Sequence, residues 1–318
     1  MVNHMKEKKY DLLCVGTAIV DCIIKGFQNQ RISKTGFAAQ STMLSMGGES
    51  INQAVVAGRL GLRVGLLCGV GRDGGGEFLR SALEQQGVDT SLLVAHAGAT
   101  PVTVMFVDEK GNRNSITNTA HHYSFRPEEH LELLEQAGAL SLGSLFRAPF
   151  VEPERLLPMV KRAKELGMTV YADTKLPNGK VLGLADMAGV LPYVDYIFPN
   201  EDEAAYYSGK SDPAEMAEVF FSYGVGHVIV KLGERGCYYK SADRTLSLPG
   251  RKVEAIDATG AGDNFAAAFI TAKTEGEDDL TALRFATACA ALSTTKIGAT
   301  AGVLDRESVE RFLLEEQS

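Results

Sequence analysis

The chain has 318 residues, 45% of them apolar, and its 40 acidic and 32 basic side chains give a formal net charge of −8. That length allows one large domain or two ordinary ones with a substantial core, and the acidic balance argues against nucleic acid or an anionic membrane surface as a partner. No apolar run approaches the roughly 18 residues of a membrane span, and residues 1–10 lack the apolar stretch of a signal peptide. We therefore expect a cytoplasmic protein.

The cysteines give no sign of a disulfide framework or a metal site. None of the five forms a C-x-x-C pair, and most lie in apolar surroundings: Cys14, Cys22, Cys68, Cys237 and Cys289. The pattern predicts reduced, mostly buried thiols.

Strand-like and helix-like segments alternate along the chain. Short apolar runs predict strands over 12–16, 64–68, 168–172, 193–198 and 227–231. Helical patterns occupy 52–60, 77–86, 154–166 and 216–223, and the first three are followed directly by a glycine. This alternation predicts an α/β fold over 1–318, with a doubly wound, mostly parallel sheet flanked by helices.

Two stretches, 18–46 and 100–120, break the alternation because strand-like segments follow one another without a helix. Within the second, residues 102–107, a polar turn and residues 114–118 predict a hairpin. We expect these strands to form a small inserted sheet that covers the pocket as a lid; the alternative is an edge hairpin without a function. Exposed strand edges need covering, so a homodimer formed through the lid is expected.

A glycine pair precedes the first predicted helix. Gly47 and Gly48 allow close approach to the backbone, and Asn52 offers donors and acceptors. Asp21 follows the first strand, near the edge where a parallel sheet collects ligand groups. Together they suit a polyhydroxyl ligand, although Gly-Gly is also common before helices and Asp21 could be a solvated acid.

Residues Gly69 to Gly74 match G-x-G-x-x-G and raise the alternative of an NAD-dependent oxidoreductase. Three features argue against it. Asp73 lies inside the turn, where a pyrophosphate would sit. Asp89, the candidate ribose ligand, follows a helix stop instead of a strand. The helix is also predicted to begin late, near Glu77. We expect a glycine-shaped turn with Asp73 facing solvent or substrate.

The most informative segment is Asp257-Ala258-Thr259-Gly260-Ala261-Gly262-Asp263, which runs into an apolar helix. Free N–H groups at a helix N-terminus attract anions, and glycine permits close approach. An acid beside an anion site suggests that it takes a proton from a hydroxyl that attacks a phosphate. No Walker-type G-x-x-x-x-G-K-[ST] sequence is present, which argues against a P-loop enzyme.

These motifs resemble the ribokinase-like (PfkB) family of carbohydrate and nucleoside kinases over essentially the whole chain. One family signature matches Gly47, Gly48, Asn52 and Ala54. The other matches Asp257 and Gly260 to Asp263, with Ala258 where the family has threonine. Further family-like elements are the N-x-x-E segment 200–203, the strand and turn 230–236, and the helix and loop 285–299.

The resemblance implies transfer of the γ-phosphate of ATP to a hydroxyl of a sugar or sugar derivative. It makes Asp263 the general base and assigns the anion hole to Gly260, Ala261 and Gly262. It assigns the substrate to Asp21, Gly47, Gly48 and Asn52. Phe265 and Phe269 are expected to pack in the core without touching the cofactor.

For the nucleotide side, the resemblance implies contacts from Asn200, Lys231, Gly233 and Gly236. It implies Mg²⁺ supported through water by Glu203, and a monovalent cation such as K⁺ at Asp257 and Thr259. Lys231 could instead end its strand in solvent, and Glu203 could be an ordinary acid at a helix N-terminus.

Several questions stay open at this level. A nucleoside kinase of the same family and a catalytically silent sugar-binding protein both fit the motifs. The acceptor, the hydroxyl that is phosphorylated and the roles of His121 and His122 are not fixed by the sequence.

Overall fold

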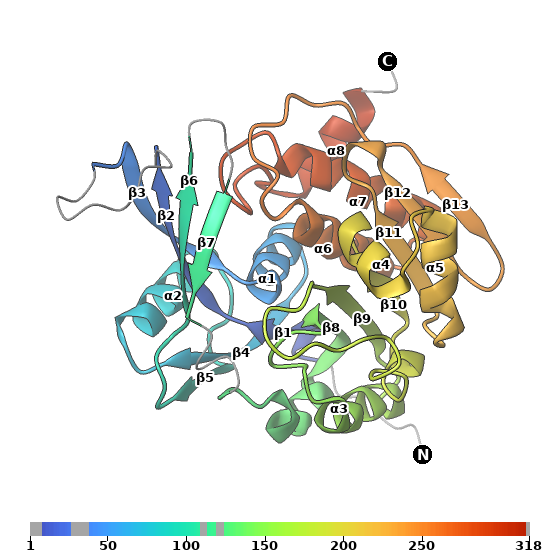
Figure 1. Cartoon of the computed structure of the whole chain (residues 1–318), viewed down its shortest axis with the longest axis horizontal. Helices are drawn as coiled ribbons and strands as arrows, with labels where there is room; N and C mark the ends of the chain where they lie inside the picture. The colour runs from blue at the N-terminus through green and yellow to red at the C-terminus, as the bar shows by residue number, and fades with distance from the viewer. Residues whose placement is uncertain (1–7, 27–37, 109–112, 119–123, 316–318) are drawn as a thin grey trace.

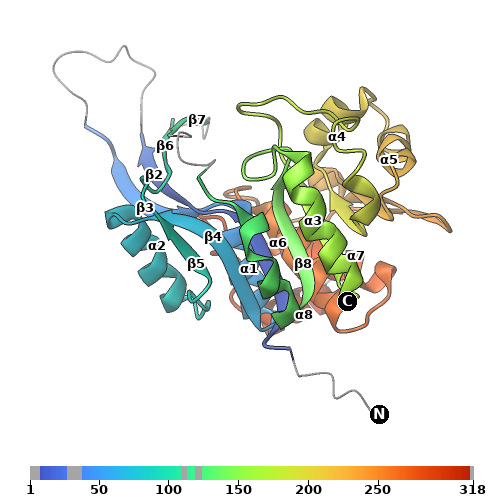
Figure 2. The same ribbon diagram turned by 90° about the horizontal axis from the view of Figure 1, so that it is seen from below.

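The computed structural model describes residues 8–26, 38–108, 113–118 and 124–315 (Figure 1). His121 and His122 lie outside these ranges. Within the described residues, no helix combines the length and the apolar character needed to cross a membrane. The chain folds into a large sheet covered by helices and a smaller sheet that projects from the main body (Figure 2).

The large sheet confirms the doubly wound prediction. Its strands run in the order β13 (Thr245–Leu248), β12 (Cys237–Lys240), β11 (His227–Lys231), β10 (Tyr196–Phe198), β9 (Thr169–Thr174), β8 (Ala137–Leu145), β1 (Tyr10–Thr17), β4 (Val64–Gly71) and β5 (Leu93–His96). Neighbours from β11 to β5 pair in parallel, and β12 and β13 add an antiparallel edge. The carboxyl ends of seven parallel strands therefore meet at one edge.

Helices cover both faces of this sheet. One layer consists of α1 (Glu49–Arg59), α2 (Gly74–Gln85), α6 (Ala261–Thr274), α7 (Asp279–Ser293) and α8 (Arg306–Glu315). The other consists of η1 (Pro127–Gln136), α3 (Pro153–Glu165), η2 (Leu191–Tyr193), α4 (Glu201–Ser208) and α5 (Pro213–Ser222). In β1, Leu12 and Cys14 face the first layer while Leu13 and Val15 face the second. Burial on both faces explains the continuous apolar runs.

The smaller sheet is the expected lid. Its order is β3 (Ser41–Gly47), β2 (Ile19–Lys25), β6 (Val102–Val107) and β7 (Arg113–Thr117). The predicted hairpin is β6 and β7, and β2 joins it in parallel to β6. Asp21 and Thr103 are paired neighbours on one face, and Cys22 and Val104 are paired neighbours on the other.

Several predicted boundaries were wrong. Helix α1 begins at Glu49 instead of residue 52, and β10 begins at Tyr196 because residues 191–193 form a 3₁₀ turn. Helix α2 begins at Gly74, not near Glu77, because the Asp73 carboxylate caps it by accepting from the Gly76 N–H at 2.9 Å. A cap moves a helix start without changing the apolar periodicity from which the start was predicted.

The turn at Gly69 to Gly74 serves the fold. Asp73 accepts hydrogen bonds from the backbone N–H and the hydroxyl of Thr100, at 2.8 and 2.6 Å. The sequence had predicted that Asp73 faces solvent or substrate, whereas both of its carboxylate oxygens bind groups of the protein itself. A Cβ on Gly71 would meet the Thr100 nitrogen at 2.5 Å, so the protein's own loop fills the space over this turn. Asp89 binds the Tyr10 hydroxyl at 2.7 Å. This arrangement argues against a dinucleotide site.

The cysteines are all free, as predicted. Four are buried, and Cys22, on β2 of the lid, is half-buried. Phe269 also packs as expected: its ring contacts Phe198 and Tyr196, with ring centroids 5.4 and 5.2 Å apart.

Candidate active site

The two glycine motifs meet at the N-termini of α1 and α6, which pack against each other (Figure 1). The amide Nδ2 of Asn52 donates to Oδ2 of Asp263 at 2.7 Å, across 211 residues of sequence. Both side chains are buried. The general-base candidate is thus held by a substrate-binding candidate from the other motif.

The start of α6 has the geometry of an anion site. Gly260 is the N-cap with φ +74°, and a Cβ there would meet the Ala299 carbonyl oxygen at 2.5 Å. Among the described residues no side chain caps this helix, and the first N–H groups of a helix have no intrahelical acceptor. The backbone N–H groups of Gly262 and Asp263 lie in this first turn, where they can bind a phosphate.

Asp257 and Thr259 brace the loop that leads into α6. Asp257 Oδ1 accepts from the Thr259 N–H and hydroxyl at 2.9 and 2.6 Å, and Oδ2 accepts from the Gly298 N–H at 3.0 Å. Asn264 donates to the carbonyls of Gly260 and Ala299, both at 2.7 Å. Its own Oδ1 is buried without a hydrogen-bond partner in the described part of the chain. Oxygen atoms that could ligate a cation therefore lie close together at this loop and the start of α6.

Lys231, at the end of β11, lies beside the same turn. Its Nζ is 2.8 Å from Oδ1 of Asp173 and 2.9 Å from where a Cβ on Gly262 would lie. Its side chain is only 11% exposed, so it does not simply end its strand in solvent. Burial raises the pKa of Asp173, and the ion pair with Lys231 opposes that rise. A fixed positive charge thus stands next to the free N–H groups of α6.

A cavity of about 880 Å³ opens next to Lys231 and the start of α6. Among its walls are Lys231, Gly233, Gly236, Arg251, Ala261, Gly262, Phe265, Thr287, Ala291 and Thr294. This volume is in the range of small-molecule sites. Phe265 both packs near Phe198 and lines the cavity, which the sequence reasoning missed. Asn200 is not part of the lining; it bridges to Lys231 through the backbone.

Glu203 is buried behind Lys231. It forms a capping box with Asn200: Oε2 accepts from the Asn200 N–H at 3.0 Å, and the Asn200 side chain accepts from the Glu203 N–H at 2.9 Å. The Thr174 hydroxyl donates to the same Oε2 at 2.8 Å. Burial raises the pKa of Glu203, and Lys231 opposes this. Glu203 is therefore an acid at a helix N-terminus, which was the alternative that the sequence left open. It also lies close to the charges of Lys231 and Asp173.

The glycine pair separates the lid from α1. Gly48 has φ +109°, and a Cβ there would lie 2.3 Å from the Thr17 carbonyl oxygen. A Cβ on Gly47 would lie 2.3 Å from Oδ2 of Asp21, so only glycine leaves room for that carboxylate. Burial and the nearby Glu49 raise the pKa of Asp21 to about 6.

Two charged residues of the site, Glu49 and Lys175, escaped the sequence analysis. Lys175 Nζ lies 2.8 Å from Oε1 of Glu49, and the Ser144 hydroxyl donates to Oε2 at 2.5 Å. Burial alone would raise the pKa of Glu49, but Lys175 and Ser144 outweigh it and lower the pKa to about 2. The available signals were weak: Glu49 directly follows the glycine pair, and Lys175 lies two residues after Asp173.

The environment of Asp263 favours its protonated form. Burial and the charge of Glu49 raise its pKa to about 7, against the opposing influence of Lys175. A carboxyl group with this pKa exchanges a proton readily near neutral pH, which suits a general base.

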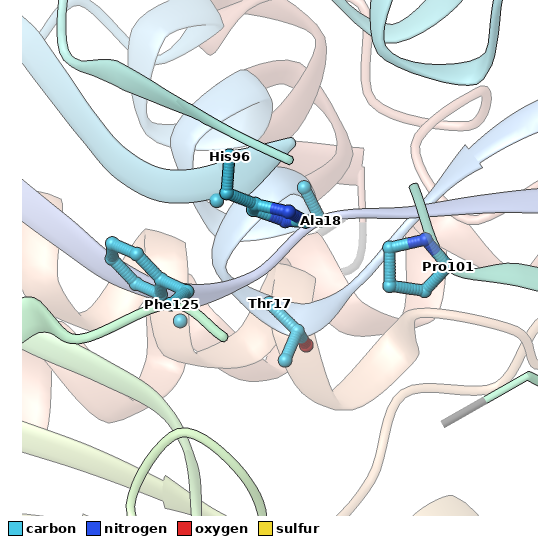
Figure 3. A pocket seen from close by; sticks show the side chains of 7 residues that line it. Thr17, Ala18, His96, Pro101 and Phe125 are labelled. Atoms are coloured by element: carbon cyan, nitrogen blue, oxygen red, sulfur yellow. The ribbon is translucent and has the colours of Figure 1, made fainter. Parts of the chain in front are cut away.

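A second pocket lies under the lid hinge, between Thr17, Ala18, His96, Pro101 and Phe125 (Figure 3). Its volume is about 10 Å³, at most room for one water molecule. It is a packing gap where β1 turns into β2, and the ligand space lies elsewhere.

Comparison with known proteins finds relatives that match most of the chain. The pfkB family carbohydrate kinase profile matches residues 9–306. The chain is 29% identical to a ribokinase of Haemophilus influenzae over 86% of its length and 89% of that protein. It is 32% identical to an ATP-dependent ribose-1-phosphate kinase of Halopiger xanaduensis, covering 82% and 84%. The structure of Arabidopsis thaliana ribokinase complexed with ribose and ATP superposes with a TM-score of 0.83 at 25% identity, covering 96% and 98%.

The raised pKa of Asp263 predicts a pH-dependent stability effect. A carboxyl whose folded pKa is about 7, against 3.8 normally, stabilises the fold below about pH 4 and loses that contribution as pH rises through 7. Asp263→Asn keeps the bond from Asn52 but carries no charge. Its melting temperature should exceed that of the wild type by an amount that grows between about pH 4 and 7 and then stays constant. Differential scanning fluorimetry would check this, with Asp243→Asn, an exposed position, as the control. If Asp263→Asn were less stable than the wild type by the same amount at every pH, the prediction would be wrong.

Proposed function

The chain belongs to the pfkB family of carbohydrate kinases, and from this premise we propose that it transfers the γ-phosphate of ATP to a hydroxyl of a sugar or sugar derivative. The observation that carries the proposal is the position of Asp263. It lies in the first turn of α6, beside backbone N–H groups that have no acceptor within the helix, and accepts the Asn52 hydrogen bond at 2.7 Å. A base and an anion site thus adjoin each other between the acceptor side and the nucleotide cavity.

In this mechanism Asp263 accepts the proton of the acceptor hydroxyl as that oxygen attacks the γ-phosphate in line. Asn52 fixes the carboxylate, and the pKa of about 7 keeps it ready to take up a proton. Asp21, Gly47 and Gly48 hold the acceptor by its other hydroxyls, with the glycines leaving the backbone accessible. Proximity and orientation supply a large part of such rate enhancements.

The negative charge that develops on the transferred phosphoryl group is stabilised on the nucleotide side of Asp263. The N–H groups of Gly260, Ala261, Gly262 and Asp263 form the anion hole, and the positive end of the α6 dipole adds to it. Lys231 contacts the phosphates from the end of β11, since its Nζ already lies against Gly262. Gly233 and Gly236 line the nucleotide cavity, and Asn200 supports Lys231 through the backbone.

The charge balance of the site fits Mg²⁺. In the buried cluster around Asp263, the carboxylates of Asp173, Glu203, Asp263 and Glu49 lie near Lys175 and Lys231, and a triphosphate adds further negative charge. Bound Mg²⁺ would neutralise the phosphates while keeping several waters. Glu203 is placed to accept a hydrogen bond from such a water. K⁺ at Asp257 and Thr259 would use oxygen atoms of that loop as ligands, among them the Asp257 carboxylate and the Thr259 hydroxyl.

Two rival readings make different predictions. A nucleoside kinase would phosphorylate only nucleosides, and a silent sugar-binding protein would bind sugars without turnover. An assay with ATP and Mg²⁺ across pentoses, hexoses, keto-deoxy acids and nucleosides separates all three. We place the reaction in the cytoplasm, where ATP is available and free thiols such as Cys14 stay reduced.

Asp263→Asn should lower kcat by at least about 10²-fold, because general bases contribute 10²- to 10⁴-fold. ATP binding, measured by isothermal titration calorimetry, should remain. In the wild type, kcat should rise with pH, with the value at pH 6 about a tenth of the plateau above pH 8, from the pKa of about 7. Exposed Asp243→Asn is the control. Unchanged turnover in Asp263→Asn would overturn the assignment of the base.

Glu203→Gln should raise the Mg²⁺ concentration needed for half-maximal rate by about tenfold, since groups that orient a metal's ligands contribute this much affinity. Glutamine can still form the capping box with Asn200, so the change tests the charge. Asp202→Asn, one residue earlier and exposed, is the matched control. Equal Mg²⁺ dependence in both variants would remove Glu203 from the metal site.

We also propose a homodimer formed through the lid. Leu44, Cys22, Val104 and Ile116 lie in register across the face opposite Asp21, and Leu44 and Ile116 are 55% and 71% exposed. Such a row favours burial against a second copy.

Sedimentation should give twice the chain mass of 34.1 kDa for the wild type. It should give the mass of one chain for Leu44→Glu, because a buried charge would destabilise the interface. Leu304→Glu, equally exposed but on the main body, should stay dimeric. A monomeric wild type would disprove the proposed dimer.

A further inference from the structure

The acceptor end of the site carries more negative charge than the transfer needs. A kinase of this design requires one base, here Asp263. Two additional carboxylates, Glu49 and Asp21, stand next to it, and the proximity of Glu49 to each of the other two raises their pKa values. This surplus has no role in the proposed proton transfer.

Glu49 is built into this position. It is the first residue of α1 and lies one helical turn before Asn52, so its side chain is on the same face as the residue that holds the base. Ser144, at 2.5 Å, and Lys175, at 2.8 Å, fix the two carboxylate oxygens. Its side chain is 15% exposed. A carboxylate fixed in this way remains charged through the working pH range.

The neighbouring positive charges are already engaged. Lys175 pairs with Glu49, and Lys231 pairs with Asp173 on the phosphoryl side at 2.8 Å. With Asp21, Glu49 and Asp263 ionised, Lys175 leaves the acceptor end with a formal charge of about −2, from three carboxylates and one ammonium group. A phosphate or carboxylate on the acceptor would meet like charge in a partly desolvated space, a recognised device of specificity.

We propose that the acceptor is a polyhydroxyl compound without a negative charge, and that Glu49 is a specificity-determining residue that rejects phosphorylated and carboxylated sugars. This inference rests on the proposed kinase function and narrows its substrate class. It separates this chain from its relative named as a ribose-1-phosphate kinase, whose acceptor is anionic.

The first experiment measures kcat/KM with ATP and Mg²⁺ for matched acceptor pairs: ribose with ribose 1-phosphate and ribose 5-phosphate, glucose with gluconate, and a nucleoside with its monophosphate. We expect the uncharged member of the best pair to exceed its anionic partner by at least about tenfold. An anionic acceptor equal to or better than its neutral partner would overturn the inference and leave the kinase assignment intact. Transfer to none of the acceptors, with ATP still bound, would overturn the proposed function and the inference with it.

The second experiment changes the charge. Glu49→Gln frees Lys175 and lowers the formal charge to about −1, so the ratio of neutral to anionic kcat/KM should fall by at least about tenfold. The double variant Glu49→Gln/Lys175→Met returns the charge to about −2 without leaving an unpaired lysine, and the ratio should recover. Exposed Glu77→Gln on α2 is the control, with an unchanged ratio.

The ratio distinguishes selectivity from a structural role. If Glu49 only braces α1, Glu49→Gln would lower kcat/KM for neutral and anionic acceptors alike, and an unchanged ratio in that variant would overturn its assignment. If Glu49→Gln fails to fold, as judged by circular dichroism, Lys175→Gln decides the point. It keeps Glu49 and changes the formal charge of the acceptor end to about −3, so the ratio should rise, and an unchanged ratio would overturn the inference.

Discussion

The hydrogen bond from Asn52 to Asp263 is the contact on which the rest of the site depends. It joins the N-termini of α1 and α6, two helices that follow different strands and are separated by most of the chain. The helix dipoles of both point toward the same small region. The proposed acceptor contacts on one side and the proposed anion hole on the other thus share one fixed point. Neither motif would form a reaction centre without the other.

The site is a region of concentrated buried charge, which proteins tolerate only at a cost in stability. Glu203, Asp173 and Asp263 all have raised pKa values because burial disfavours their ionised forms. A pKa moved toward neutrality is what a proton acceptor needs, so the destabilisation and the proposed chemistry have the same physical origin. Glu49 is the exception, since its pairing with Lys175 and Ser144 keeps its pKa low. A permanently charged neighbour suits selection of the acceptor better than proton transfer.

The lid connects this chemistry to the surface of the molecule. Strand alternation places Asp21 on the face toward the glycine pair and Leu44 on the opposite face. One small sheet thus presents a carboxylate on the side of the proposed acceptor site and an apolar row on its other face. The nucleotide cavity, by contrast, is built entirely from the main domain, between Lys231 and the α6–α7 layer. In the proposed mechanism, acceptor choice and nucleotide binding therefore depend on different parts of the chain.

The sequence by itself determined the parallel sheet, the lid strands and the turn at Gly260, because these depend on local periodicity and on glycine's conformational freedom. It also identified Asp263 and Asn52 as separate candidates. Only the tertiary structure decided that they touch, that Asp73 caps α2, and that Phe265 lines the cavity as well as the core. It alone revealed the pair of Glu49 and Lys175, which are 126 positions apart in the sequence. Local patterns specify backbone conformation, whereas contacts between distant charges and the pKa values that follow exist only once the sheet has brought them together.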